Sequence, residues 1–279
     1  MRLQSANMDG VLEEMSDFLS ELVPENKIKV AEGKFGKVSV WKHKDTQKLF
    51  LQKEITPENF NGIEVMVHDL MKNNKFFIKL YYFSTTLKTH LLIMDYIKGG
   101  DLWDLLRQEH KLEEMETKLI IMQLVEALYY LHLHQIIHND IKLENIIYSR
   151  YRQIYLCDYG LCKSVKTDSC YDGTMDYFSP EKIKGHQYNF SFDWWAVGIL
   201  TYELITGYHP YKSYSDEDLS VKMLHYRQQH KKLKFNSKLS KVVVMFIDGM
   251  LKYNFNYRLN NVYDIMKQEF INIDINLLK

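Results

Sequence analysis

One short stretch in the middle of the chain gathers side chains that could carry out a group transfer. In IHNDIKLENII, residues 137–147, an Asp, a Lys two places later and an Asn five places later stand between apolar residues. The carboxylate of Asp140 can accept a proton from a hydroxyl nucleophile. The ammonium of Lys142 can stabilise charge on a moving phosphoryl group, and the amide oxygen of Asn145 suits Mg²⁺.

A second acid follows this stretch. In LCDYG, Asp158 stands directly behind a short apolar run, where its carboxylate could bind the same Mg²⁺ ion as Asn145. A polar loop between two helices would explain the first stretch taken by itself. The two stretches together indicate phosphoryl transfer from a nucleotide to a hydroxyl group, a reaction that depends mainly on positioning and charge stabilisation.

Two features earlier in the chain suit nucleotide phosphates. In AEGKFGKVSV, Gly33 and Gly36 stand between strand-like runs, and glycines let backbone amides approach phosphate oxygens closely. An ordinary hairpin would explain this pattern equally well. Lys53, inside the apolar run FLQKEI, requires an anionic partner, and Glu64 on the next predicted helix is the best-placed carboxylate. A lysine that extends to the surface is the alternative.

The hydrophobic pattern predicts the elements that would hold these residues. Strand-like runs fill 27–56 and recur twice within 76–97, with a helical stretch at 63–72. Beyond residue 101 the pattern is mostly helical, and 194–205 is typical of a helix buried on most sides. We therefore predict an α+β fold in which two lobes enclose a ligand cleft. The predicted parts are an N-terminal helical extension (1–26), a small β-rich lobe (27–97) and a larger helical lobe (98–279), with a hinge near 95–100.

The N-terminal residues predict an amphipathic helix. GVLEEMSDFLSELVP carries an apolar stripe at helical spacing and is stopped by Pro24. The stripe consists of Val11, Leu12, Met15, Phe18, Leu19 and Leu22. Because such a stripe is too wide to leave exposed, it either docks onto its own chain or forms a homodimer contact.

Composition excludes several classes of protein. The 279 residues have a formal net charge of zero, which gives no argument for direct binding to nucleic acid or to a membrane. The 3 cysteines, with no C-x-x-C pair, argue against a disulfide scaffold or zinc ribbon and fit a reducing compartment. The first ten residues lack a signal-peptide core, and Glu203 interrupts the most apolar run. We expect an intracellular protein without a membrane span.

In order and spacing, these motifs resemble the eukaryotic protein kinase family. The similarity covers about residues 28–258: EGKFGKV matches the glycine-rich loop, HNDIKLEN the catalytic loop, DYG the metal-binding triad and GTMDYFSPE the end of the activation segment. Asp193 in SFDWWAVG matches the family's buried helix aspartate. Arg258 matches the arginine that, in the family, pairs with the residue corresponding to Glu181. The resemblance implies a bilobal protein kinase fold, with a β-rich N-lobe and a helical C-lobe, that uses ATP and Mg²⁺.

The resemblance also implies the residues that would bind and act on ATP. LIMDYIKGGDL looks like the hinge, with Met94 as gatekeeper and with backbone groups of Asp95 and Ile97 facing adenine. The implied ATP-binding residues are Val30, Ala31, Gly33, Phe35, Gly36, Val38, Lys53, Met94, Asp95, Ile97 and Asp101. The implied catalytic residues are Asp140, Lys142, Lys53, Glu64 and Thr174, and the implied metal ligands are Asn145 and Asp158.

The substrate side resembles that of serine/threonine kinases. Lys142 and Thr174 match the serine/threonine pattern, which implies a protein substrate with a Ser or Thr acceptor. Asp101, Glu144 and Glu203 align with carboxylates that bind arginines before the target hydroxyl. We therefore expect a basic substrate, although each acid could instead serve only the fold.

Longer strings extend the resemblance. GILTYELITGYHPY and GGDL are similar to the basophilic group that includes the cyclic-AMP-dependent kinase. IHNDIKLEN together with LIMDYIKGGDL is similar to the serine/threonine kinases of baculoviruses. A viral kinase would act in the cytoplasm or nucleus of the host cell or be associated with the virion, and an arginine-rich DNA-condensing protein would be a reasonable substrate.

Several positions depart from the family's pattern. Ala31 replaces the first glycine of the loop, and Tyr159 replaces a phenylalanine, which should still pack if its hydroxyl finds a partner. Asn139 replaces the arginine that pairs with an activation-loop phosphate, and the usual phosphorylated position falls near Cys170. Because both halves of that interaction are missing, we predict activity without activation-loop phosphorylation.

Two other functions remain open. Ala31 and Asn139 would suit a pseudokinase that acts as a scaffold, but the retained catalytic and metal-binding residues disfavour that reading. A small-molecule phosphotransferase of kinase-like fold is the other alternative. GTMDYFSPE, which shapes a peptide-binding surface in kinases, disfavours it.

Overall fold

A computed structural model of the chain describes residues 8–28, 36–213 and 219–272. The chain divides into two compact units. The first comprises residues 1–73 and 78–97, and the second comprises residues 74–77 and 98–279. Within the second unit, Phe77 forms an isolated parallel bridge with Leu156, which ties the short segment 74–77 to that unit.

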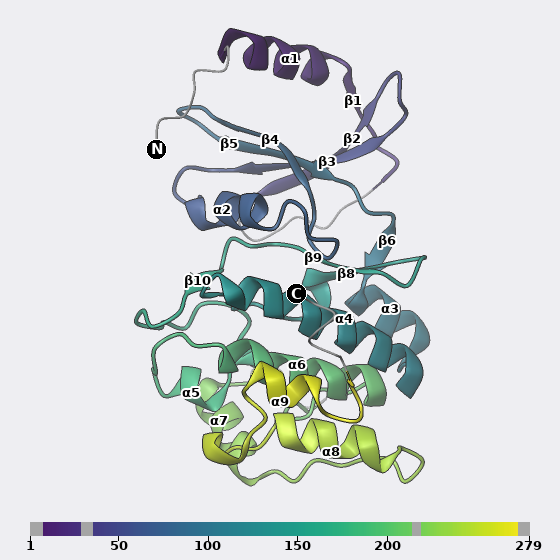
Figure 1. Ribbon diagram of the computed structural model, residues 1–279, viewed down its shortest axis with the longest axis vertical. Coiled ribbons are helices and arrows are strands. Elements are labelled where there is room, and N and C mark those ends of the chain that lie inside the picture. Colours follow the sequence, from purple (N-terminus) through teal and green to yellow (C-terminus); the bar gives the residue numbers. More distant parts are fainter. Residues whose placement is uncertain (1–7, 29–35, 214–218, 273–279) are drawn as a thin grey trace. The chain divides into compact units, whose positions relative to one another are not determined.

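The first unit is built on a five-stranded antiparallel sheet (Figure 1). The strand order is β1-β2-β3-β5-β4, so β2–β3 and β4–β5 are hairpins. Apolar residues on both faces of the sheet, such as Val40, Phe50 and Ile93, are buried. The strands are β1 (Leu22–Pro24), β2 (Lys37–His43), β3 (Leu49–Ile55), β4 (Leu80–Thr85) and β5 (His90–Asp95).

Helix α1 (Met8–Ser20) packs on one face of this sheet. The ring of Phe18 lies edge-on to Phe50, with ring centroids 5.1 Å apart, and 4.9 Å from the ring of Tyr82. Leu19 joins the same apolar cluster. The helix therefore docks onto its own chain. Of the predicted stripe, the side chains of Val11 and Leu12 lie outside the described residues.

The predicted helix is wrong in its last turn. It ends at Ser20, and Leu22–Pro24 forms strand β1, which pairs with β2 between Trp41 and His43. Leu22 is buried in the same apolar cluster, but from a strand and not from the helical stripe. A proline is tolerated at the edge of a sheet, because an edge strand need not donate every backbone N–H.

Helix α2 (Gly62–Leu70) belongs to the opposite face of the sheet (Figure 1). The side chain of Asn61 caps it by accepting a hydrogen bond from the backbone N–H of Ile63. Lys53 and Phe50 are an odd number of positions apart on β3, so they project to opposite faces of the sheet. Phe50 faces α1, and Lys53 faces α2.

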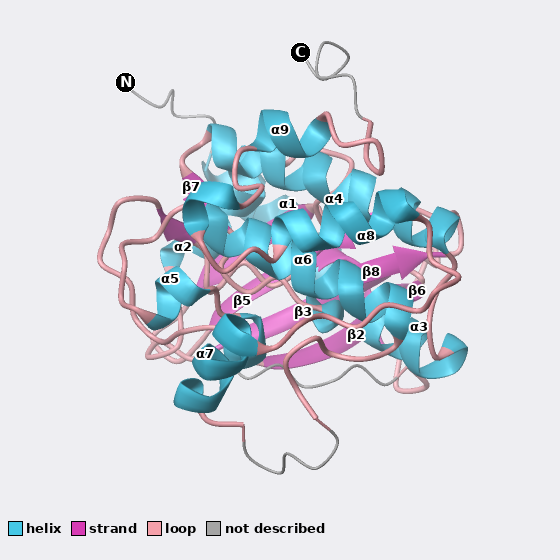
Figure 2. Ribbon diagram, turned by 90° about the horizontal axis from the view of Figure 1, so that it is seen from below, coloured by secondary structure: helices cyan, strands magenta, loops and turns pink. Residues whose placement is uncertain are grey.

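The second unit is mainly helical (Figure 2). Its central helix α6 is buried at every position but Thr206, in agreement with the buried helix predicted for 194–205, and it packs against α4 and α8. The helices are α3 (Leu102–Glu109), α4 (Glu114–Leu133), α5 (Pro180–Ile183), α6 (Ser191–Thr206), α7 (Val221–His230), α8 (Lys241–Met250) and α9 (Val262–Met266). Among the described residues, no helix combines the length and apolarity needed to cross a membrane.

The second unit also contains short strands and 3₁₀ turns between its helices. The sequence pattern, which was mostly helical beyond residue 101, did not predict them. A three-stranded sheet has the order β6-β8-β9, and β10 pairs with β7. The predicted strand over 76–83 is displaced: β4 begins at Leu80, because 74–77 belongs to the second unit. The short elements are β6 (Gly99–Asp101), β7 (Ile136–Ile137), β8 (Ile146–Ser149), β9 (Ile154–Leu156), β10 (Lys163–Ser164), and the 3₁₀ turns η1 (Leu143–Asn145), η2 (Met175–Tyr177) and η3 (Phe255–Tyr257).

Candidate active site

A buried carboxylate on α6 fixes the loop that carries Asp140. The two oxygens of Asp193 accept the consecutive backbone N–H groups of His138 and Asn139, each at 2.8 Å. His132 contacts the same carboxylate at 2.8 Å. Burial would raise the pKa of Asp193, but the hydrogen bond and charge of His132 lower it. Asp193 thus holds the loop as an ionised carboxylate.

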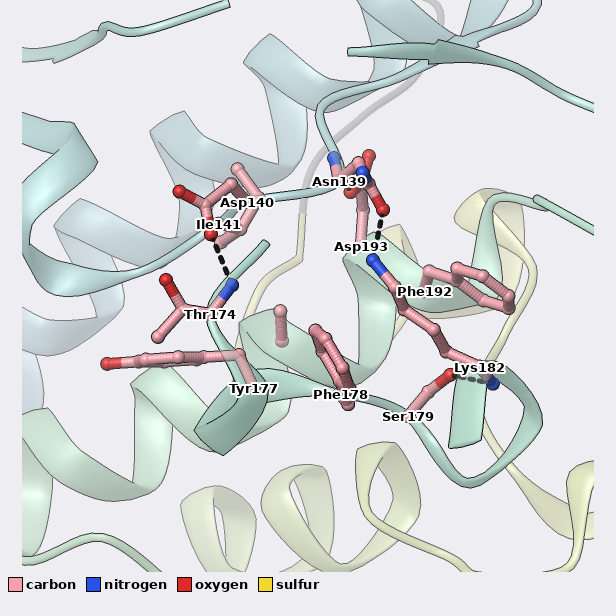
Figure 3. Close-up of a pocket in the computed structure, with 11 residues that line it drawn as sticks. Asn139, Asp140, Ile141, Thr174, Tyr177, Phe178, Ser179, Lys182, Phe192 and Asp193 are labelled. Atoms are coloured by element: carbon pink, nitrogen blue, oxygen red, sulfur yellow. Dashed lines mark hydrogen bonds between the residues drawn. The ribbon is translucent and has the colours of Figure 1, made fainter. Parts of the chain in front are cut away.

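Asp140 lies at the centre of a small hydrogen-bonded cluster, and Figure 3 shows its bond to Thr174. Its Oδ1 accepts the backbone N–H of Thr174 at 2.8 Å, and its Oδ2 accepts Nδ2 of Asn145 at 2.9 Å. The Nζ of Lys142 lies 3.2 Å from Oδ2 of Asp140 and donates to Oγ1 of Thr174 at 3.0 Å. The structure therefore brings three of the predicted residues, Lys142, Asn145 and Thr174, together around the buried carboxylate of Asp140.

The two predicted metal ligands come from adjoining loops of the second unit. The backbone oxygen of Asn145 accepts the N–H of Cys157, the residue before Asp158, at 3.1 Å. Both hydrogen bonds that orient the Asn145 side chain use its amide nitrogen, so its amide oxygen is the atom that can bind a cation. Asp158, two residues after the end of β9, has a left-handed backbone with φ of 59°.

This donor set suits Mg²⁺ better than a metal that needs a full protein cage. Within 8–28, 36–213 and 219–272, no group of three or more His, Cys, Asp or Glu side chains could hold a metal ion. Mg²⁺ is commonly held by one or two protein oxygens together with phosphate and water oxygens. Asn145 and Asp158 offer such a pair.

Tyr159, which replaces a phenylalanine of the family's pattern, is fully buried. Its hydroxyl donates to the backbone oxygen of Leu156 at 2.6 Å, and its ring lies 5.7 Å from that of Phe77. The expectation that this tyrosine packs once its hydroxyl has a partner is confirmed.

In the first unit, Lys53 and Glu64 form a buried ion pair. Nζ of Lys53 lies 2.7 Å from Oε1 of Glu64, and both side chains are less than one-tenth exposed. Lys53 comes from β3 and Glu64 from the first turn of α2. The pairing is the one that the sequence predicted, and it satisfies an ammonium that would otherwise be costly to bury.

Of the other residues of the first unit that are implied in ATP binding, some have a clear place in the sheet and some lie outside the described residues. A Cβ at Gly36 would lie 2.3 Å from the backbone oxygen of Glu54, so the approach of β2 to β3 already requires glycine there. Val38 stands opposite Lys53 on neighbouring strands. Four more of the implied residues lie outside the described residues: Val30, Ala31, Gly33 and Phe35.

The hinge-like segment is partly engaged in the sheet of its own unit. Met94 is buried in β5. The backbone N–H of Asp95 donates to the oxygen of Lys79 at 2.9 Å, and its carboxylate accepts the hydroxyl of Tyr81 at 2.9 Å. Ile97 follows β5 and is half-buried.

The three predicted substrate-binding acids differ in surroundings. Asp101 caps α3, where its Oδ1 accepts the N–H of Asp104 at 2.8 Å. Glu144 is exposed. Glu203 is buried, and its Oε2 accepts the hydroxyl of Tyr177 at 2.6 Å. Burial raises the pKa of Glu203 to about 8; the charge of Glu144 adds to this, and the Tyr177 hydrogen bond opposes it.

A further predicted pair, Arg258 and Glu181, is bidentate and buried. The two guanidinium nitrogens donate to the two carboxylate oxygens at 2.7 and 2.8 Å.

Sequence reasoning missed three other residues near the site: Asp172, Tyr177 and Lys182. No spacing pattern in the sequence marks them.

Comparison with known proteins identifies the family to which this chain is similar. A model of the protein kinase domain matches residues 25–271. The chain is 50% identical over 265 residues to serine/threonine-protein kinase 1 of Heliothis zea nuclear polyhedrosis virus, covering 94% of this chain and 99% of that protein. It is 47% identical over 264 residues to the protein of the same name from Lymantria dispar multicapsid nuclear polyhedrosis virus, covering 94% and 96%.

A solved structure shares the fold. The Cydia pomonella granulovirus kinase PK-1 superposes with a TM-score of 0.87 at 38% identity, over 94% of this chain and 99% of that one. The α+β protein kinase fold that the motifs implied is therefore confirmed. From the family match, the viral relatives and this structure together, the chain belongs to the protein kinase family, as one of its serine/threonine protein kinases.

Proposed function

We propose that the chain transfers the γ-phosphoryl group of ATP to Ser or Thr residues of a basic protein, with Asp140 as the proton acceptor. One observation carries this assignment: the Asp140 carboxylate is buried yet held in place by the N–H of Thr174 and the amide of Asn145. A carboxylate fixed in this way needs little reorganisation when it accepts a proton.

Each residue of the cluster has a distinct part in this proposal. Asp140 would orient the acceptor hydroxyl and receive its proton. Lys142, which already lies between Asp140 and Thr174, would stabilise charge on the transferred group. Mg²⁺ bound with ATP would neutralise phosphate charge, and Asn145 and Asp158 are the oxygen donors suited to hold it.

In the first unit, Lys53 would bind phosphate oxygens of ATP. Its ammonium is kept in a fixed position by Glu64 at 2.7 Å. Two anions can share one lysine because an ammonium has three donors. We extend the proposal to the adenine contacts implied for Met94, Asp95 and Ile97.

The acceptor preference is proposed from charge. The charges of Glu144 and Asp176 both raise the pKa of the buried Glu203, so these three acids lie near one another in the second unit. A group of carboxyl side chains favours arginines in the substrate. An arginine-rich DNA-condensing protein remains the proposed target, and the viral relatives support a place of action in the host cell.

The proposal includes activity without a phosphate on the activation segment. Asn139 takes the place of the arginine, and its Nδ2 donates to the backbone oxygen of Leu161 at 3.0 Å and to Asp172 at 3.1 Å. These hydrogen bonds occupy the side chain with partners of the chain itself. Protein shown by mass spectrometry to carry no phosphate should therefore phosphorylate a peptide at the same rate as phosphorylated protein.

The direct test uses labelled ATP, Mg²⁺ and an arginine-containing peptide. Asp140→Asn keeps the shape of the side chain and should lower the rate by roughly 10²–10⁴-fold, the effect of a positioned proton acceptor. Nucleotide affinity, measured by calorimetry, should stay the same and serves as the control for folding. A variant that keeps more than a tenth of the rate would contradict the role of Asp140, and wild-type protein that labels no peptide would contradict the proposed function.

A further inference from the structure

Asp172, in the segment between DYG and SPE, is held by side chains from several parts of the second unit. Its Oδ1 accepts Nδ2 of Asn139 at 3.1 Å and the hydroxyl of Tyr188 at 2.8 Å. Nζ of Lys182 lies 3.1 Å from Oδ1, and Nζ of Lys163 lies 3.0 Å from Oδ2. The carboxylate therefore has two ammonium groups and two neutral donors around it.

Lys182 makes this cluster a part of the fold, since its side chain is only 2% exposed. It also donates to Oδ1 of Asn139 at 2.6 Å and to the backbone oxygen of Asp172 (Figure 3 shows Lys182 reaching Asn139). A buried ammonium is stable only with such partners. Burial alone would raise the pKa of Asp172, but the Asn139 hydrogen bond and the charge of Lys182 lower it to about 2. Asp172 is therefore an anion at any working pH.

The two residues that follow Asp172 lead directly to Asp140. Gly173 has φ of 92°, and a Cβ there would lie 2.9 Å from the backbone oxygen of Asn139, so this close approach requires glycine. Thr174 then donates its N–H to Oδ1 of Asp140 at 2.8 Å (Figure 3). Because one residue separates the held carboxylate from the peptide group that contacts Asp140, the position of Asp172 determines that of Thr174.

We propose that Asp172, Lys163 and Lys182 form a carboxylate anchor that positions Thr174 against Asp140, using a charge of the chain itself in place of an added phosphate. Asp172 is thus a positioning residue, which acts through Thr174 and does not touch the reacting atoms. The inference rests on the proposed role of Asp140. It explains how a segment with Asn139 at its base can be ordered without modification.

The experiment compares Asp172→Asn, which removes the charge and keeps the shape, with Asp168→Asn. Asp168 lies on the same segment, is exposed, and contacts only the exposed side chain of Gln187 among the described hydrogen bonds, so it is a matched control. For Asp172→Asn, kcat/KM for peptide should fall at least roughly tenfold, as for the loss of a charge-assisted network. The KM for ATP should stay within about twofold of wild type.

Hydrogen exchange gives a readout that does not depend on turnover. Backbone amides of residues 170–177 should exchange at least roughly tenfold faster in Asp172→Asn and at the wild-type rate in Asp168→Asn. If Asp172→Asn does not fold, Lys163→Met, which changes a more exposed member of the cluster, takes its place with the same expected direction in both measurements.

A smaller loss of kcat/KM, or unchanged exchange in residues 170–177, would overturn the anchor while leaving the proposed function intact. An inactive wild-type protein would overturn the proposed function instead, and the exchange measurement would still decide whether the anchor exists.

Discussion

The raised pKa of Glu203 makes peptide recognition depend on pH. Burial raises the pKa of this carboxyl to about 8, so at pH 7 it is mostly protonated in the absence of peptide. An arginine remains charged throughout this range, and it should bind the ionised carboxylate far better than the neutral acid. Raising the pH from 7 to 9 should therefore strengthen the binding of an arginine-containing peptide.

The size of the effect follows from the ionised fraction. When only the ionised form binds, the apparent dissociation constant equals the intrinsic one divided by that fraction. With a pKa of about 8, the fraction is roughly 0.1 at pH 7 and roughly 0.9 at pH 9, so KM should fall about tenfold between these values. The direction is that of a carboxyl whose pKa is raised: the neutral form predominates below pH 8, and the charged form above it.

The assay measures KM at constant ionic strength for two peptides that differ only in one upstream residue, Arg or Gln. Taking the ratio of the two KM values cancels any pH effect on other groups, including those that act in catalysis. Glu203→Gln is the matched variant, because it keeps the acceptor oxygen for the Tyr177 hydroxyl and cannot ionise.

Two results would refute this reasoning. A KM ratio that is the same at pH 7 and pH 9 in the wild-type protein would show that Glu203 does not meet the arginine. An equal pH dependence in Glu203→Gln would assign the titration to another group.

Three further changes have defined outcomes. Arg258→Met leaves the buried carboxylate of Glu181 unpaired and should lower the free energy of unfolding by about 3–5 kcal/mol, as measured by urea denaturation. Arg258→Lys should restore part of this loss, and a loss below about 1 kcal/mol would contradict the prediction. Lys53→Met should abolish most turnover while the circular dichroism spectrum is unchanged, and normal turnover would be the contrary result. Tyr159→Phe removes one buried hydrogen bond and should cost about 1 kcal/mol of stability with kcat within threefold of wild type; a larger fall in kcat would give the hydroxyl a part in the reaction.

Some of the sequence expectations depended on local information and were accurate for that reason. HNDIKLEN places Asp140, Lys142 and Asn145 within a few positions of one another, so their neighbourhood follows from chain geometry with little help from the fold. A lysine inside an apolar strand must find an anion, and the next helix offered Glu64.

Other expectations failed where tertiary contacts overrode the local pattern. Leu22 fits the helical stripe of residues 11–22, yet pairing with β2 draws it into a strand. Strand β4 starts at Leu80 and not at residue 76, because Phe77 bridges to Leu156, far along the chain. The periodicity of a short stretch contains no information about contacts with distant segments that compete with its local preference.

By itself, the sequence determined the family, the class of reaction and the chemical type of each predicted catalytic group, because these depend on residue identity and close spacing. Only the tertiary structure decided which charges are buried and what they contact. Lys182 lies 43 residues from Asn139, and nothing in its neighbours shows that it is buried beside Asp172. The physical reason is that the cost of burying a charge, and the partner that offsets it, exist only after distant segments have packed together.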